Sequence, residues 1–157
     1  MILDETVLQR LGDWQPPGGR QTLTVNTASG WSAAITADRH DELGSLVWEV
    51  ALQRNQPSGG QTLTQRAQSV AGRVTGLLEQ LKVVEIDLQK NEALLRSDEQ
   101  GRRGERLAYY EVLLKNTSAA SIRRFQALPL SGKRDQVAFG LTNEALAKLI
   151  ADVTLQD

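Results

Sequence analysis

His40, the only histidine of the chain, lies in a charged stretch that could support acid–base chemistry. Asp38 and Asp41 are close enough in sequence to orient its imidazole, as a carboxylate does for a histidine general base. The same stretch ends at Gly44 and separates two segments with alternating apolar residues, which is typical of the solvated turn of a hairpin. We therefore interpret the stretch as a connection, and a hydrolase that uses His40 ranks last among our hypotheses.

Other catalytic and metal-binding patterns are weak or missing. The chain has no cysteine, which excludes disulfides, thiolate nucleophiles and cysteine-ligated metals. The sequence PLSGKRD contains a Gly-Lys pair, but Ala127 and Arg134 stand where a phosphate-binding loop needs glycine and serine or threonine. No serine lies in a G-x-S-x-G elbow. We therefore predict no catalytic residue, no metal and no cofactor.

Positive charge is concentrated in one part of the chain. Residues 101–135 carry eight basic and three acidic side chains, although the net charge of the whole chain is −1. Arginine interleaved with aromatic residues, here Tyr109, Tyr110 and Phe125, is used in binding of single-stranded nucleic acid. The candidate nucleic-acid-binding residues are Arg102, Arg103, Arg106, Arg123, Arg124, Lys133 and Arg134. The interpretation that we prefer is a solvated sheet face with cross-strand ion pairs, for example to Glu111.

Length and composition indicate a single globular domain over residues 1–157. The chain is 40% hydrophobic and 24% charged, which is ordinary for a folded domain of this size. No apolar run approaches the roughly 18 to 20 residues that span a bilayer. Asp4 and Glu5 interrupt any signal peptide at the start of the sequence. We expect a cytoplasmic protein with no membrane partner.

Three segments with alternating apolar residues predict an antiparallel meander. They cover residues 20–26, 31–35 and 46–52, and a helix over 2–14 precedes them. We expect the Trp31 and Trp48 side chains to face a helical layer. In the third segment, the residues predicted to share one face are Leu46, Trp48, Val50 and Leu52.

A central helix is predicted over residues 61–81. Thr62 and Gln65 form a candidate capping box, and an apolar stripe follows it. Residues 82–98 leave two alternatives open. Extending the stripe would continue the helix to about residue 98, whereas the alternation of Val84, Ile86 and Leu88 with polar residues favours a strand. We choose the strand.

The C-terminal third predicts three further strands, over 106–116, 121–129 and 135–142, and a last helix over 142–153. The order is α-βββ-α-ββββ-α, an α+β fold with helices packed on a mainly antiparallel sheet. In layout alone, this order resembles the small acidic secretion chaperones, which are cytoplasmic homodimers of one helix-and-sheet domain. A resemblance of layout implies nothing about function.

The sequence predicts a well-patterned core but contains no group of residues that could converge into a reactive site. Our first hypothesis is therefore a non-catalytic protein-interaction module. It would act as an adaptor or chaperone-like protein that binds a protein partner or self-associates as a homodimer. Val47 and Ala51 make the second face of their strand partly apolar, which indicates coverage on both sides. Binding of single-stranded nucleic acid through the basic segment is the alternative.

Overall fold

Within its described residues, the chain folds into one nine-stranded antiparallel sheet and three helices. The computed structural model describes residues 5–27, 30–54, 60–77, 79–97, 107–127 and 131–155. The helices are α1 (Glu5–Asp13), α2 (Leu63–Arg73) and α3 (Asn143–Thr154). The strands are β1 (Gln21–Asn26), β2 (Trp31–His40), β3 (Gly44–Arg54), β4 (Leu81–Asp87), β5 (Glu92–Ser97), β6 (Leu107–Lys115), β7 (Ala119–Ala127), β8 (Arg134–Val137) and β9 (Phe139–Thr142). The predicted α+β class and the order of helices and strand groups are confirmed, although six strands and not four lie between α2 and α3.

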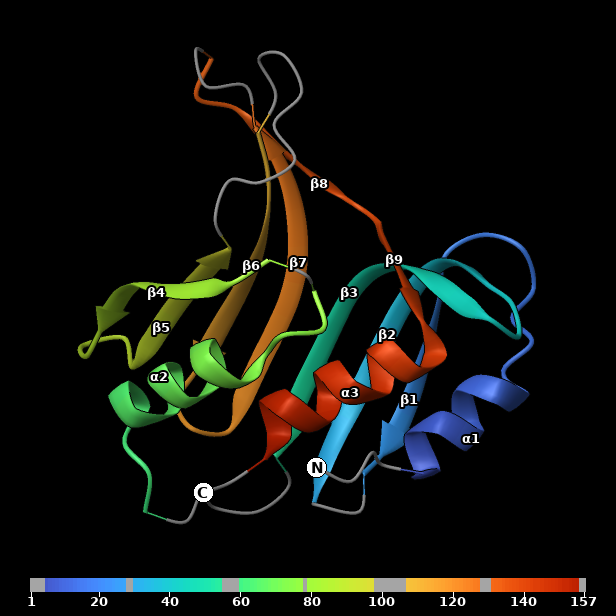
Figure 1. Ribbon diagram of the computed structural model, residues 1–157, viewed down its shortest axis with the longest axis horizontal. Helices are drawn as coiled ribbons and strands as arrows, with labels where there is room; N and C mark the ends of the chain where they lie inside the picture. The colour runs from blue at the N-terminus through green and yellow to red at the C-terminus, as the bar shows by residue number, and fades with distance from the viewer. Residues whose placement is uncertain are drawn as a thin grey trace.

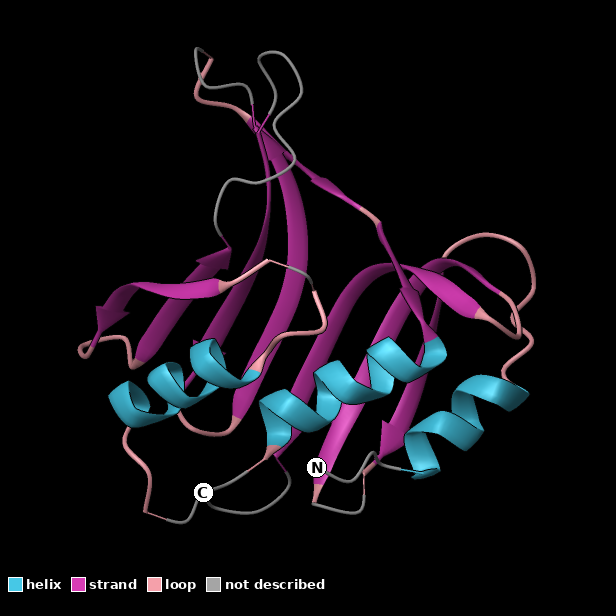
Figure 2. Ribbon diagram, in the orientation of Figure 1, coloured by secondary structure: helices cyan, strands magenta, loops and turns pink. Residues whose placement is uncertain are grey.

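The helices cover one face of the sheet, whose main strand order is β1-β2-β3-β7-β6-β5-β4. Figures 1 and 2 show α3 between α1 and α2, with the sheet behind them. Strand residues that point toward the helices, such as Val25, Ile35 and Val112, are fully buried because the helices cover them. None of the helices in the described ranges is long and apolar enough to cross a membrane.

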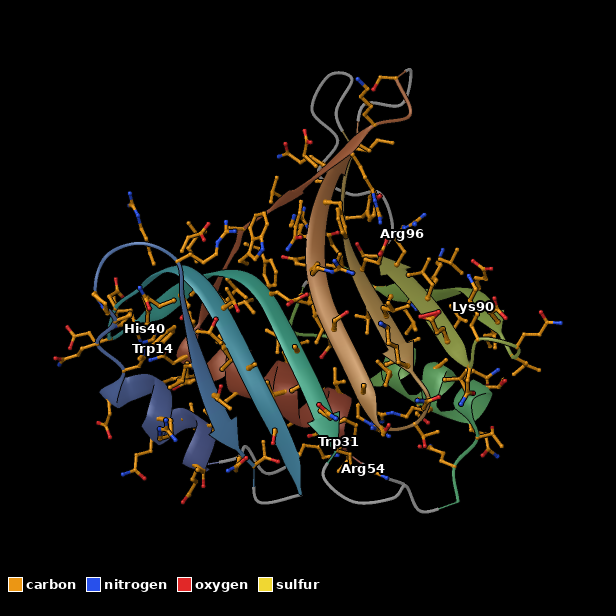
Figure 3. All side chains as sticks on the ribbon, turned by 180° about the vertical axis from the view of Figure 1, so that it is seen from behind. Trp14, Trp31, His40, Arg54, Lys90 and Arg96 are labelled. Carbon is orange, nitrogen blue, oxygen red and sulfur yellow. The ribbon has the colours of Figure 1, made fainter. Side chains whose placement is uncertain are left out.

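The opposite surface of the sheet carries no helix among the described residues (Figure 3), and we call it the helix-free face. Along each strand, its side chains alternate with those that face the core, and most of them are half-buried or exposed. Its central row is formed by Thr24, Ala34, Ala51, Ser121 and Leu113.

β3 and β7 diverge along their length, and β8 and β9 lie in the gap between them. β3 pairs with β7 only at residues 50–53. Beyond this point β9 pairs with residues 44–47 of β3, and β8 pairs with residues 124–127 of β7. Figure 1 shows the segment crossing from β7 to β3. The Gln136 amide donates to the Trp48 carbonyl at 2.9 Å, so the two halves are bridged.

A bulge in β3 changes the face on which its residues lie. Ala37 pairs with Val47 and Thr36 pairs with Glu49, so Trp48 is an extra residue in the ladder. One extra residue shifts the two-residue alternation by one position. Val47 is therefore fully buried in the core, whereas we predicted it on the second face of the strand.

Because of the bulge, the prediction that Leu46 and Trp48 share a face with Val50 and Leu52 was wrong. Val50 is fully buried as expected, but Leu46 is 37% exposed. Trp48 lies outside the core, and the Arg20 guanidinium lies 3.7 Å from the centre of its ring. Trp31 is fully buried, so only one of the two tryptophans faces the helical layer.

α2 begins at the predicted cap and ends earlier than predicted. The Thr62 hydroxyl accepts from the Gln65 N–H, and the Gln65 side chain accepts from the Thr62 N–H, which confirms the capping box. The helix ends at Arg73, not at residue 81. Gly72 lies in the last turn of the helix and Gly76 just beyond it, and a glycine inside a helix lowers its stability by about 1 kcal/mol relative to alanine.

Residues 82–97 form a hairpin, so the strand alternative is confirmed and the long helix is wrong. The Asp87 carboxylate accepts from the N–H groups of Gln89 and Lys90, and Asn91 adopts a left-handed conformation with φ of 56°. These features close the turn between β4 and β5. β5 was not predicted as a separate strand; it pairs with β4 on one side and β6 on the other.

Two arginines of α2 bind the C-terminal end of α3. Arg66 donates to the Val153 carbonyl at 2.6 Å, and Arg73 donates to the Leu155 carbonyl at 2.8 Å. Cations are stabilised at a helix C-terminus by its partial negative charge. Burial of Arg66, followed by the neighbouring charges of Arg54 and Arg73, lowers the pKa of its guanidinium to about 10. These contacts join α2 and α3 at one end.

Candidate functional site

His40, at the end of β2, connects α1 to the sheet. Figure 3 shows it beside Trp14, and the two ring centroids are 4.7 Å apart. Its Nε2 lies 2.7 Å from the Leu11 carbonyl oxygen, and its Nδ1 lies 2.6 Å from the Ser45 hydroxyl. Because a carbonyl only accepts hydrogen bonds, Nε2 carries the proton. Both ring nitrogens are thus engaged: Nε2 links α1 to the sheet, and Nδ1 links β2 to β3.

The two carboxylates predicted to orient this imidazole bond to other groups. Asp38 accepts from the Arg20 guanidinium at 2.7 Å. Asp41 accepts from the backbone N–H groups of Leu43 and Gly44, and these bonds hold the pKa of the Asp41 carboxyl below its ordinary value. A hairpin turn forms as predicted, but it covers only residues 41–43, because β2 continues to His40 and β3 begins at Gly44. Both imidazole nitrogens bond to groups other than these carboxylates.

A hollow of about 770 Å³ opens beside this turn. Residues 16–19, 38–41, 43–46 and 140–142 line it, so it is bounded by the segment after α1, the β2–β3 hairpin and β9. Leu43 belongs to this lining and is 77% exposed. The sequence carried no signal for this hollow because its lining comes from three separate segments.

The predicted nucleic-acid-binding residues do not form one patch. Arg123 and Arg124 are consecutive in β7 and therefore point to opposite faces of the sheet. Arg123 lies 3.7 Å from the Glu49 carboxylate on the helix-free face, and Arg124 lies 3.2 Å from the Glu79 carboxylate on the other side. Lys133 is exposed in the turn before β8. The residues that lie outside the described part of the chain are Arg102, Arg103 and Arg106.

Arg134, the remaining candidate, belongs to a cluster on the helix-free face together with Arg96. Both guanidiniums bind the Glu111 carboxylate, at 2.6 Å and 3.3 Å respectively, and the hydrogen bond to Glu111 raises the pKa of Arg134. Arg134 lies over the Phe125 ring and Arg96 over the Tyr109 ring. The two rings are only 6% and 8% exposed, so the arginines cover the aromatic surface that a nucleic acid base would need for stacking.

A groove of about 510 Å³ crosses the helix-free face, and we call it the sheet groove. Its floor is a row of cross-strand neighbours. Ala34 of β2 pairs with Ala51 of β3, Ala51 pairs with Ser121 of β7, and Ser121 pairs with Leu113 of β6. Because neighbouring strands lie about 4.8 Å apart, this row spans about 14 Å. Three small side chains in succession keep the floor low.

Polar side chains form the walls of the sheet groove. Glu49 and Arg123 form an ion pair on one side, and Gln53 and Lys115 stand on the other. Each wall is two residues along the strands from the floor, a distance of about 7 Å. Thr24 lines the end at β1. The groove therefore combines a mainly apolar floor with walls that offer hydrogen bonds and both signs of charge.

Of the residues that line this groove, sequence reasoning had singled out Arg123, as a candidate for nucleic acid binding, and Ala51. Ala51 was noted because it makes the second face of its strand partly apolar, and the bulge leaves it on that face. Ala34, Ser121 and Leu113 carried no signal, because their alignment in one row depends on which strands pair and in which register.

In the ranges that the structure describes, no group of three or more histidine, aspartate and glutamate side chains gathers closely enough to hold a metal ion. Comparisons with protein families, with curated proteins and with solved structures find no match. The geometry of the chain itself is therefore the basis for inferring its function.

Proposed function

We propose that this protein is a non-catalytic interaction module, an adaptor or chaperone-like protein, which binds an extended segment of a partner protein in the sheet groove. The observation that carries this proposal is the row Ala34, Ala51, Ser121 and Leu113 on a face that no described helix covers. A sheet face with apolar side chains normally packs against a second layer. A bound segment would supply that layer over the groove.

The dimensions of the floor suit a short stretch of extended chain. Its length of about 14 Å corresponds to about four extended residues. The Gln53 amide and the Thr24 hydroxyl can hydrogen-bond to the backbone of such a segment, while its side chains contact the alanines of the floor. The Glu49 carboxylate and the Arg123 guanidinium, which pair with each other here, can also bind charged side chains of the partner.

The charges of this face favour a polypeptide over a nucleic acid. Arg123 and Arg134 are paired with Glu49 and Glu111, and these carboxylates would repel phosphates brought to the same surface. A polypeptide, which carries both signs of charge, meets no such penalty. We expect the interaction to take place in the cytoplasm, because a chain without cysteine has no disulfide to gain from an oxidising compartment.

A peptide library and two substitutions test the proposal. Peptides selected from a random displayed library against the purified protein are measured by fluorescence anisotropy. Ala51→Arg fills the floor of the sheet groove, and we expect it to weaken binding at least about tenfold, as loss of a central contact does. Leu43→Arg adds the same charge at the hollow beside the hairpin turn, and we expect it to leave binding unchanged.

Two further measurements keep the result interpretable. Gln68→Arg, at an exposed position of α2, controls for the added charge, and circular dichroism melts show whether each variant folds. Binding that survives Ala51→Arg and is lost with Leu43→Arg would overturn the proposal in favour of the hollow. Salt-dependent binding of single-stranded DNA with no selected peptide would overturn it in favour of a nucleic acid.

A further inference from the structure

The two edge strands of the main sheet differ in how they are protected from pairing. β4 carries Lys82, Glu85 and Asp87, and a register shift places a bulge at Val84. Charged side chains and bulges discourage another strand from adding to an edge. β1 has neither: its sequence, QTLTVN, is uncharged, and it pairs with β2 without any register shift. β1 is therefore the edge at which pairing can occur.

The hydrogen bonds of β1 show which backbone groups face away from the sheet. Directly after β1, the Thr27 N–H donates to the Trp31 carbonyl at 2.7 Å, which marks a hydrogen-bonded pair. Bonded and non-bonded pairs alternate along an antiparallel ladder, so every second residue of β1 directs its N–H and C=O outward. No strand in the described part of the chain pairs with this side. The outward-directed residues are Thr22, Thr24 and Asn26.

We propose that β1 pairs antiparallel with β1 of a second copy of this chain, in a register centred on Thr24. Thr24 then faces Thr24 of the second copy, and Thr22 faces its Asn26. Each of these pairs contributes two backbone hydrogen bonds, so the register uses every outward-directed group of both edges. The sheets of the two copies become one continuous sheet.

The side chains of β1 are self-complementary in this register, which is why the occupant is a second copy. Leu23 faces Val25 of the second copy on the helix side, where both side chains are buried beneath their own helices. Thr22, Thr24 and Asn26 meet on the helix-free face, where they are exposed. No charged residue of β1 meets its own copy, and a two-fold interface requires such a self-complementary surface. The pairing shares Thr24 with the end of the sheet groove, but it uses the backbone groups of Thr24, whereas the groove uses its hydroxyl.

Single cysteines test the register, because the natural chain contains none. Across a bonded pair the two Thr24 Cα atoms would be about 5.5 Å apart, within the range of a disulfide. The two Thr22 Cα atoms would be about 14 Å apart. We expect Thr24→Cys to form a covalent dimer on oxidation and Thr22→Cys to remain monomeric on a denaturing gel. Equal cross-linking of the two variants would overturn the register.

Light scattering and sedimentation test the pairing itself. We expect the natural protein to have twice the chain mass of 17.3 kDa. Thr22→Pro removes an outward N–H but no hydrogen bond to β2, and it should raise the dissociation constant of the dimer at least about tenfold. Thr22→Val keeps that N–H, loses only the bond between the Thr22 and Thr36 hydroxyls, and should dimerise like the natural protein.

Circular dichroism melts establish that the proline variant folds. A measured mass of 17.3 kDa for the natural protein at high micromolar concentration would overturn the pairing. A dissociation constant that Thr22→Pro does not raise would overturn it too. Ala51→Arg should leave the dimer intact. A failure of peptide binding in the sheet groove can therefore be distinguished from a failure of the β1 pairing.

Discussion

Gly44 of β3 pairs with Thr142 of β9, and an added methyl group has no space there. A Cβ built on Gly44 would lie 2.5 Å from the Leu141 carbonyl oxygen and 3.0 Å from the Thr142 Cα. Both atoms belong to the backbone, so neither can rotate away as a side chain would. Thr142 is also the N-cap of α3, and its hydroxyl accepts from the third residue of that helix. Gly44→Ala should therefore displace β9 together with the start of α3.

The expected loss of stability follows from two opposing effects. Forcing an extra methyl group into a packed site costs about 1 to 3 kcal/mol. Replacing glycine also restricts the unfolded chain, which stabilises the folded state by about 0.4 to 1 kcal/mol. We therefore expect Gly44→Ala to lower the free energy of unfolding by about 1 to 2 kcal/mol. For a domain of this size, that loss lowers Tm by about 2 to 8 °C.

Gly140→Ala is the matched control for this prediction. Gly140 lies in β9, in the same ladder, and a Cβ built there meets no atom within 4 Å. It should have the stability of the natural protein or slightly more. Urea denaturation followed by circular dichroism measures both variants, and the steepness of unfolding should not change. A Gly44→Ala protein as stable as Gly140→Ala would refute the close approach of β9 to β3.

Two further predictions concern charges. Glu111→Gln should lower the free energy of unfolding by about 1 to 2 kcal/mol, because Glu111 is buried while Arg96 and Arg134 are only partly exposed. Glu49→Gln should lower the free energy of unfolding by less than Glu111→Gln, because the ion pair of Glu49 is more exposed. Urea denaturation measures both variants, and equal losses would contradict this expectation. The pKa of Asp41 is lowered in the fold, so its stabilisation is present above its ordinary pKa of 3.8 and is lost as pH falls through the folded value. Asp41→Asn should thus flatten the decline of Tm in acid, and an unchanged decline would refute the role of its backbone hydrogen bonds.

Local features of the fold could be predicted because neighbouring residues determine them. The Thr62–Gln65 capping box and a hairpin turn before Gly44 depend on hydrogen bonds within a few residues, and both are confirmed, although the turn is shorter than the predicted connection. The α+β class also follows from local alternation of apolar residues. The end of α2 was predicted too late because the apolar stripe continues past Arg73, although the chain turns into β4 to pair with β5.

The candidate site was less accessible to sequence reasoning. The arginines of residues 101–135 formed one cluster in the sequence, but the fold places Arg123 and Arg124 on opposite sides of the sheet and pairs each with a carboxylate from a distant segment. The bulge at Trp48 is also invisible locally, since it exists only in relation to β2. Both features require knowledge of strand partners.

The sequence by itself determined the kinds of element, their order and the apolar core-facing side of most strands, because hydrophobic periodicity and capping are local properties. Only the tertiary structure created the surfaces on which the two proposals rest. The sheet groove exists because Ala34, Ala51 and Ser121 lie in one row, and that row depends on β3 pairing with β7 across nearly 70 intervening residues. The open edge of β1 likewise depends on which strands end the sheet. Strand order and register are set by the free energy of the whole core, which no single segment contains.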